Sequence, residues 1–399
     1  MSEEPAVRPT RRSLLFAGGA GLAAGVTGMV TVGAVGGGDP EPEGAHAPVS
    51  GGQSQITTVD PHGVHQAGTH RPLTPPTHLS LHVFESERSA LSAADLAATL
   101  TELGTVISAL TMPEPRHERL SAPPVDLTVQ VGVGPRVVAA AGLTLDVRLP
   151  EFAGSDAIPA RLRRGDLIIS VAARHPEISV QASDVVAELL TAAGFTPSWS
   201  QLGFRPQGEG TIAANPLGFD DGIVQPATAG GVPEHVYLDE GPAKNGTIGV
   251  IRRFVLDTAA FARLDRDQQE HVFGRDKATG APLSGGTRDT DVNLGTKTAT
   301  GEYLVPAGSH VRAAHPSFTG STLMLRRSYG YRESVDGRLD RSGLLFISFQ
   351  DDLEVFSRTQ SRMDREDRLM EFATATAEVA FLVLPGFDAE RPLGSTLFR

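Results

Sequence analysis

The sequence predicts an α+β fold made of two ferredoxin-like units whose antiparallel sheets pack together. Short apolar runs with the alternation of half-buried strands are interleaved with segments of helical period. The order strand, helix, strand, strand, helix occurs twice along the chain. A length of 399 residues is enough for two such units, each with its own hydrophobic core.

The first predicted unit covers residues 78–215. Alternating apolar residues favour strands over 78–85, 125–134 and 166–174, and helical spacing favours helices over 89–110 and 182–194. Ser92 is suited to cap the first of these helices.

The second predicted unit covers residues 216–399 and repeats the order of the first. Its expected elements are a strand over 246–257, a helix over 258–277, strands over 322–331 and 343–350, and a helix over 369–379. Because ligand clefts often form between units, the junction near residue 216 is a natural place for a site.

Residues 1–47 resemble an export signal followed by a linker. Arg11 and Arg12 stand just before an uncharged run over 14–35, which is the arrangement of a twin-arginine signal. A retained membrane anchor is the alternative, but the many glycines of the run make a poor span. We expect recognition by the twin-arginine export machinery, cleavage of the signal, and a secreted, cell-envelope or periplasmic protein. Residues 48–77 are expected to form an irregular arm.

The composition restricts the chemistry. The chain has no cysteine, which excludes disulfides, thiolate nucleophiles and thiolate ligands. A formal net charge of -12 argues against a nucleic-acid partner. Metal or cofactor ligands must therefore come from His, Asp and Glu.

Three histidines lie close together in the arm, in the stretch "HGVHQAGTHRP". They are His62, His65 and His70, and imidazoles at such spacing can share a metal ion. Loops with scattered histidines are commoner than such metal sites, so the sequence favours the simpler explanation.

Two adjacent aspartates interrupt the apolar run "LGFDDGIVQP". The flanking glycines allow close approach of backbone to a ligand, and a carboxylate placed there can act as an acid or base. On spacing alone, a structural Gly-Asp turn is favoured over a catalytic role for Asp221, and more strongly for Asp220.

A second cluster occurs in "GSHVRAAHPSFTGSTLMLRRSYGY". It contains His310 and His315, and it places Arg326 in an otherwise apolar strand. A charge in such a strand needs a partner, because burying it unpaired is costly. Taken alone, each of the two histidines is better explained by an ordinary core or surface role.

Taken together and in order, "GFDDG", "SHVRAAHP", "LMLRRSYGY" and "GLLFISFQ" resemble the dye-decolourising peroxidases, bacterial haem enzymes built from two ferredoxin-like units. The resemblance extends from about residue 59 to "VLPG" near the end and is strongest to the exported branch of that family. It implies one haem b per chain, held in the C-terminal unit.

The resemblance assigns roles residue by residue. Asp221 matches the distal acid-base residue, and Asp220 falls at a variable position. His310, rather than His315, matches the axial ligand of the haem iron. Arg326 matches the distal arginine. Some members carry Asn two residues after this arginine, where this chain has Ser328.

The resemblance also implies supporting contacts to the haem. The residues expected against the porphyrin are Gly222, Ile223, Val224 and His315. Asp367 is expected to hold the imidazole of the axial ligand, and Arg275 to pair with a haem propionate.

The implied reaction is reduction of hydrogen peroxide coupled to oxidation of dyes, phenolics or other one-electron donors. Bulky donors cannot reach a buried haem, so an electron relay through Trp199, Tyr237, Tyr329 or Tyr331 is a hypothesis, with core packing as the simpler explanation. Two alternatives stay open: a haem-handling or iron-releasing protein of the same fold, and a non-enzymatic haem- or metal-binding module that uses the histidine arm. A homo-oligomer is compatible with the sequence.

Overall fold

The computed structural model describes residues 57–335 and 338–398. The expected export signal therefore lies outside the described residues. Within them, two four-stranded antiparallel sheets form, each in the strand order of a ferredoxin-like unit. The α+β fold predicted from the sequence is confirmed.

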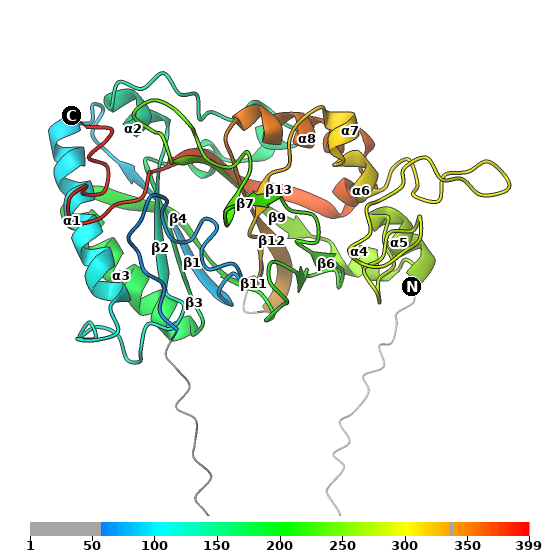
Figure 1. Ribbon diagram of the computed structural model, residues 1–399, viewed down its shortest axis with the longest axis horizontal. Coiled ribbons are helices and arrows are strands. Elements are labelled where there is room, and N and C mark those ends of the chain that lie inside the picture. Colours follow the sequence, from blue (N-terminus) through cyan, green and yellow to red (C-terminus); the bar gives the residue numbers. More distant parts are fainter. Residues whose placement is uncertain (1–56, 336–337, 399) are drawn as a thin grey trace, which may run out of the picture. The chain divides into compact units, whose positions relative to one another are not determined.

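The first sheet has the order β4-β1-β3-β2, and its helices α1 and α3 cover one face (Figure 1). Ser92 caps α1 as expected, since its side chain accepts a hydrogen bond from the N–H of Asp95. The elements of this part are β1 (His78–Ser86), α1 (Ala93–Thr111), β2 (Thr128–Val133), α2 (Pro135–Ala140), β3 (Leu167–Ala173), α3 (Pro176–Ala192) and β4 (Phe195–Phe204), with 3₁₀ turns at Ser155–Ala157 and Ala160–Leu162.

The second sheet has the order β11-β12-β9-β13, with the short β10 continuing the line of β11 along β12. Its elements are β9 (Thr247–Leu256), α4 (Thr258–Ala262), α5 (Arg266–Phe273), α6 (His310–Ala313), α7 (Pro316–Thr319), β10 (Leu325–Arg326), β11 (Tyr329–Val335), β12 (Arg338–Gln350), α8 (Leu353–Glu366), a 3₁₀ turn at Arg368–Phe372 and β13 (Ala373–Val383). Two small hairpins precede it: β5 (Ala213–Ala214) with β6 (Asp220–Asp221), and β7 (Thr228–Ala229) with β8 (Val232–Pro233).

The two sheets join at both edges. β4 pairs with β11 at one edge, and β2 pairs with β13 at the other, so the strands close into a ring. One buried apolar cluster fills the ring and takes residues from both sheets, among them Leu81, Ile251, Leu345 and Phe381. This core makes the two units one body.

Strand alternation separates this core from a second apolar layer on the opposite face of the second sheet. On β12, Leu345 points into the ring, whereas Leu344 and Phe346 line a cavity on the other side. On β9, Ile251 points inward and Phe254 lines the cavity. The helices α4 to α8 lie near this part of the molecule (Figure 1).

The predicted helix over 369–379 is wrong. This stretch forms the end of a 3₁₀ turn and then strand β13, and the helix lies earlier, at α8. From Ala377 to Val383 β13 is buried and pairs with β9, so tertiary pairing overrides the helical propensity of its alanines. Strand β4, which completes the first sheet, is not among the elements predicted from the sequence.

Two other predicted elements are each divided in two. The helix expected over 258–277 becomes α4 and α5, because Asp265 starts a new helix with a capping box to Gln268. The strand expected over 322–331 breaks at Arg327 and Ser328, which separate β10 from β11. This break matters for the site, because it follows Arg326 directly.

Candidate active site

A cavity of about 590 Å³ lies against the outer face of the second sheet. Its volume is typical of sites that bind small molecules or cofactors. Its walls are largely apolar, with a few polar groups. The sequence-predicted residues that line it are Asp221, Gly222, Ile223, Val224, Arg275, His310, His315 and Arg326.

His310 stands at the start of α6 and is fixed by a buried carboxylate. Its Nδ1 lies 2.7 Å from Oδ2 of Asp367, whose side chain is fully buried. Oδ1 of Asp367 accepts the N–H of Leu369 at 2.8 Å and so caps the 3₁₀ turn. Because Nδ1 is engaged, Nε2 is the ring nitrogen left for a ligand.

The charge of Asp367 also acts on the protonation of His310. Burial disfavours the charged imidazolium, but the neighbouring carboxylate outweighs it and raises the pKa of His310. The hydrogen bond to Asp367 thus sets the orientation of a basic imidazole. Histidines that ligate metals commonly donate their other ring N–H to a carboxylate in the same way.

His315 also borders the cavity but has a different local role. Its Nδ1 accepts the N–H of Ser317 at 3.1 Å and caps α7. Burial lowers the pKa of His315. The negative charge of Asp291 opposes this effect but does not reverse it. Among the described residues, no carboxylate forms a hydrogen bond with His315 like the one between Asp367 and His310.

Asp221 and Arg326 meet on another part of the cavity wall. Nε of Arg326 lies 3.8 Å from Oδ1 of Asp221, and both side chains are partly exposed to the cavity. Gln225 fixes their relative position, since its Oε1 accepts the N–H of Arg326 at 3.0 Å and its Nε2 donates to the carbonyl of Arg326 at 3.1 Å. Sequence reasoning missed Gln225; its only signal is a polar residue at the end of the apolar run.

Two glycines set the backbone conformation of the aspartate motif. Gly222 has a φ of +87°, and a Cβ there would stand 2.3 Å from the carbonyl oxygen of Thr211. Gly218 has a φ of +83° and lies under the side chain of Lys277. Only glycine adopts these conformations without strain, and the turn directs Asp221 into the cavity.

Asp220 projects differently from its neighbour. It is exposed at the edge of the cavity, and its charge acts on Arg275 and Arg288. Asp221, in contrast, uses Oδ1 to accept the N–H of Gly222 at 2.7 Å. The two adjacent carboxylates therefore have different surroundings.

Arg275 follows α5 and is 7% exposed. Its Nη1 donates to the carbonyls of Gly280 and Arg288 at 2.6 and 3.1 Å. Burial, followed by the charge of Arg326, lowers the pKa of Arg275. It supplies positive charge to the cavity wall.

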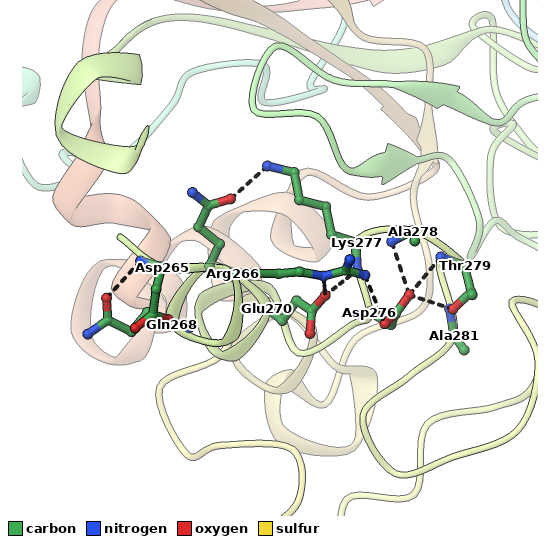
Figure 2. Close-up of polar contacts among 10 residues, drawn as sticks. Asp265, Arg266, Gln268, Glu270, Asp276, Lys277, Ala278, Thr279 and Ala281 are labelled. Atoms are coloured by element: carbon green, nitrogen blue, oxygen red, sulfur yellow. Dashed lines mark hydrogen bonds and ion pairs between the residues drawn. The ribbon is translucent and has the colours of Figure 1, made fainter. Parts of the chain in front are cut away.

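The segment that carries Arg275 is held by a dense set of polar contacts. Figure 2 shows that Arg266 and the N–H of Lys277 both donate to Oε1 of Glu270, at 2.7 and 3.0 Å. Nζ of Lys277 lies 5.2 Å from the ring centroid of Phe219, which stacks on Phe273. These contacts connect the aspartate motif to α5.

The four proposed relay residues do not line the cavity. Trp199, Tyr329 and Tyr331 are buried in the core inside the ring, and Tyr237 packs against that core. The three arm histidines do not meet at one point either: His62 bonds to Ser108, whereas His65 and His70 both contact Tyr237, with 5.5 Å between their ring centroids. Within residues 57–335 and 338–398, no group of three His, Cys, Asp or Glu side chains could hold a metal ion.

The cavity fits a haem. It is mostly apolar, and His310 brings a carboxylate-supported imidazole to its wall. Arg275 and Arg326 provide cations for anionic groups on a ligand. Asp221 provides an acid-base group in the same space.

Comparison with known proteins agrees with this geometry. The C-terminal region of Dyp-type peroxidases matches residues 213–388. The chain is 30% identical to a dye-decolorizing peroxidase of Thermobifida fusca over 79% of each chain, and 29% identical to a deferrochelatase of Yersinia pestis over 100% of this chain and 96% of the other. A crystal structure of a DyP-type peroxidase from Streptomyces coelicolor is similar over 86% of this chain and 97% of its own, with a TM-score of 0.78 and 28% identity.

The closed pair of ferredoxin-like sheets and the histidine-bearing cavity define the protein as a haem peroxidase. The chain belongs to the dye-decolourising, or DyP-type, peroxidase family.

Proposed function

We propose that this peroxidase binds one haem b in the cavity of its second unit and reduces hydrogen peroxide while oxidising dyes, phenolics or other one-electron donors. The observation that supports this most strongly is that one cavity is lined both by His310, which is held from behind by Asp367, and by the pair of Asp221 and Arg326. The first pair suits an iron ligand, and the second suits proton transfer beside it.

His310 is the residue proposed to ligate the haem iron through Nε2. Bound there, haem supplies the redox chemistry that accepts two oxidising equivalents from peroxide. Asp367 holds the ring and raises its basicity through the 2.7 Å bond to Nδ1. Gly222, Ile223, Val224 and His315 are the residues proposed to pack against the porphyrin, and Arg275, which also lines the cavity, is the proposed partner of a propionate.

Asp221 is the proposed acid-base group. Its carboxylate accepts a proton from one oxygen of peroxide and returns it to the other, which leaves as water. Arg326, whose Nε lies 3.8 Å from Oδ1 of Asp221, donates hydrogen bonds to the departing oxygen and stabilises the charge that develops on it. Gln225 keeps this arginine in place through its two backbone bonds.

Ser328 lies beside this pair rather than in contact with the main cavity. It borders a chamber of about 20 Å³ that Asp221 and Arg326 also line, together with Arg205. Its hydroxyl oxygen accepts a hydrogen bond from the N–H of Ile347 at 3.4 Å. We therefore assign peroxide activation to Asp221 and Arg326 without a third side chain from position 328.

Removal of iron from haem is a second candidate function. It is favoured by the alignment of the whole chain with a deferrochelatase of Yersinia pestis. The two functions differ in their product, because iron release leaves a metal-free porphyrin whereas peroxidase turnover leaves the haem intact. Anaerobic incubation with haem, followed by porphyrin fluorescence and assay of free iron, separates them.

We also propose that the protein is exported through the twin-arginine route. Arg11 and Arg12 before the uncharged run over 14–35 support it. Replacing both arginines by Lys should leave the protein in the cytoplasm. Extracytoplasmic recovery of that variant at the wild-type level would contradict this proposal.

An absorbance experiment tests the proposed function. The protein is reconstituted with haem, and its Soret band is followed on a stopped-flow instrument after mixing with peroxide. A Soret band that shifts with one equivalent of peroxide and returns on addition of a phenolic donor supports a peroxidase. Absence of a Soret band, or a band that peroxide leaves unchanged, would refute it.

A further inference from the structure

Three of the four methionines in the described part of the chain line the cavity. They are Met324, Met363 and Met370. The fourth, Met112, follows α1 at the protein surface and is 47% exposed. Because the chain has no cysteine, these thioethers are the only sulfur groups of the described residues. Most of that sulfur therefore borders one cavity.

Two of the cavity methionines flank the carboxylate that holds His310. Met363 lies in the last turn of α8, and its carbonyl accepts the N–H of Asp367 at 2.9 Å. Met370 lies in the 3₁₀ turn that follows, and its N–H donates to the carbonyl of Asp367 at 3.1 Å. Both side chains are half-buried. Their backbone is thus fixed beside the residue that orients the proposed iron ligand.

Met324 lies on another part of the wall, two residues before Arg326. Leu325, between them, packs into the core of the ring, so the alternation of an extended chain places Met324 and Arg326 on the cavity side. Met324 is 7% exposed and packs in the apolar cluster that includes Phe356 of α8. Thioethers therefore border the cavity both near the distal arginine and near Asp367.

The cavity wall offers few other side chains that peroxide oxidises. Among the described residues that line it, none is Cys, Tyr or Trp. A thioether, in contrast, takes up one oxygen atom and becomes a sulfoxide. Methionine also fills irregular apolar space, so packing alone is the alternative that an experiment must exclude.

We propose that Met324, Met363 and Met370 form an oxidation site that takes up oxygen from hydrogen peroxide inside the cavity when no external donor is present. This inference rests on the proposed peroxidase function and adds a second fate for the oxidising equivalents of peroxide. The acceptor is a thioether of the chain itself in place of a dye or phenol.

The step is a two-electron oxygen transfer. The O–O bond of hydrogen peroxide breaks, one oxygen forms a bond to Sδ of a methionine, and the other oxygen leaves as water with both protons. The sulfur is oxidised by two electrons and the peroxide is reduced by two, so the step needs no further reactant. Asp221 and Arg326 line the same cavity, so the three thioethers are exposed to the oxidant where it is activated.

Oxidation would change the properties of the cavity wall. A sulfoxide is polar, whereas the wall is largely apolar, and a polar group buried there without a hydrogen-bond partner is unfavourable. At Met363 and Met370 the change occurs next to Asp367 in the chain. We therefore expect the haem to be held less firmly after oxidation, and its Soret band to decrease over repeated additions of peroxide.

A map of sulfoxide along the chain tests the proposal. The haem-loaded protein is treated with several equivalents of peroxide without donor, the reaction is stopped with catalase, and the sulfoxide fraction at each methionine is measured by mass spectrometry. A protease that cleaves after arginine separates the four methionines into four peptides. We expect several-fold more sulfoxide at the three cavity methionines than at Met112, although Met112 is the most exposed.

Two controls link the oxidation to chemistry in the cavity. Asp221→Ala, which removes the proposed acid-base group, should lower the sulfoxide fraction at the cavity methionines without lowering it at Met112. An excess of a phenolic donor should protect the cavity methionines in the wild type, because it consumes the same oxidising equivalents. Cavity sulfoxide that neither control reduces would contradict the proposal.

Replacement by leucine, which has a similar volume but no sulfur, tests the consequence for the haem. The triple variant Met324→Leu, Met363→Leu, Met370→Leu should keep its Soret band through more additions of peroxide than Met112→Leu, the matched control. Equal loss of the band in both variants would contradict the expected effect of oxidation. The sulfoxide map of the wild type decides the proposal even if the triple variant does not fold.

The outcomes separate this proposal from the proposed function. If the Soret band of the wild type does not respond to peroxide, the proposed function fails. If the band responds as expected but the cavity methionines stay unoxidised, or carry no more sulfoxide than Met112, the oxidation site is wrong and these residues only pack the wall.

Discussion

His310 and Asp367 are joined by a 2.7 Å hydrogen bond between Nδ1 and a carboxylate that is itself held by the N–H of Leu369. The two residues are 57 positions apart, and the bond brings α6 against the turn before β13. The carboxylate fixes the ring and contributes a negative charge behind the proposed iron ligand.

Asp367→Asn removes the negative charge and leaves one acceptor oxygen, whereas Asp367 uses both of its oxygens, one for Nδ1–H of His310 and one for the N–H of Leu369. Loss of the negative charge makes His310 a weaker donor, so the ferric form should be less stabilised and the reduction potential should rise. A spectroelectrochemical titration of the haem-loaded protein measures this. An unchanged potential would show that Asp367 only positions the ring.

The two histidines of the cavity should respond differently to removal. His310→Ala should abolish the axial ligation of reconstituted haem, because the ring with a carboxylate partner is lost. His315→Ala should keep it, because His315 uses its Nδ1 to cap α7. Soret absorbance and the ligand-field spectrum distinguish the two. Loss of ligation only in His315→Ala would reverse the assignment.

Gly222→Ala should disturb the aspartate turn. The added Cβ would stand 2.3 Å from the carbonyl oxygen of Thr211, at a φ of +87°. Gly230→Ala is the control, because Gly230 has a φ of +60° and nothing within 4 Å of the added atom. We expect Gly222→Ala to lower the free energy of unfolding by about 1–3 kcal/mol more than the control, as overpacking does. Equal urea midpoints would contradict the steric argument.

The arm histidines predict a pH dependence of stability. His65 and His70 have a pKa of about 4 in the folded protein, below the ordinary value of 6.5. Between these values the unfolded chain binds more protons, so the stabilisation is complete above about pH 6.5 and is lost as the pH falls toward 4. Urea unfolding at several pH values should show a shallower fall for the double variant His65→Asn, His70→Asn. The same slope in both proteins would contradict the prediction.

The sequence predicts most of the strands because they alternate locally, as in β1 and β12. It fails at β13, whose alanines and threonines become a strand only because β9 and β2 provide pairing partners far along the chain. Asp221, His310 and Arg326 are recognisable because each sits in a distinctive short motif. Gln225 is not, because its function depends on a backbone contact with a residue 101 positions away.

The difference between the two adjacent aspartates is the most direct test of the proposed mechanism. Asp221 lines the cavity 3.8 Å from Arg326, whereas Asp220 is exposed at its edge beside Arg275 and Arg288. The measurement is the stopped-flow rate of the peroxide-induced Soret change in haem-loaded Asp221→Ala and Asp220→Ala. We predict that Asp221→Ala slows this rate by about 10²- to 10⁴-fold, as loss of a general acid-base group does, and that Asp220→Ala leaves it near the wild-type value. A wild-type rate in Asp221→Ala, or an equal loss in both variants, would contradict the account.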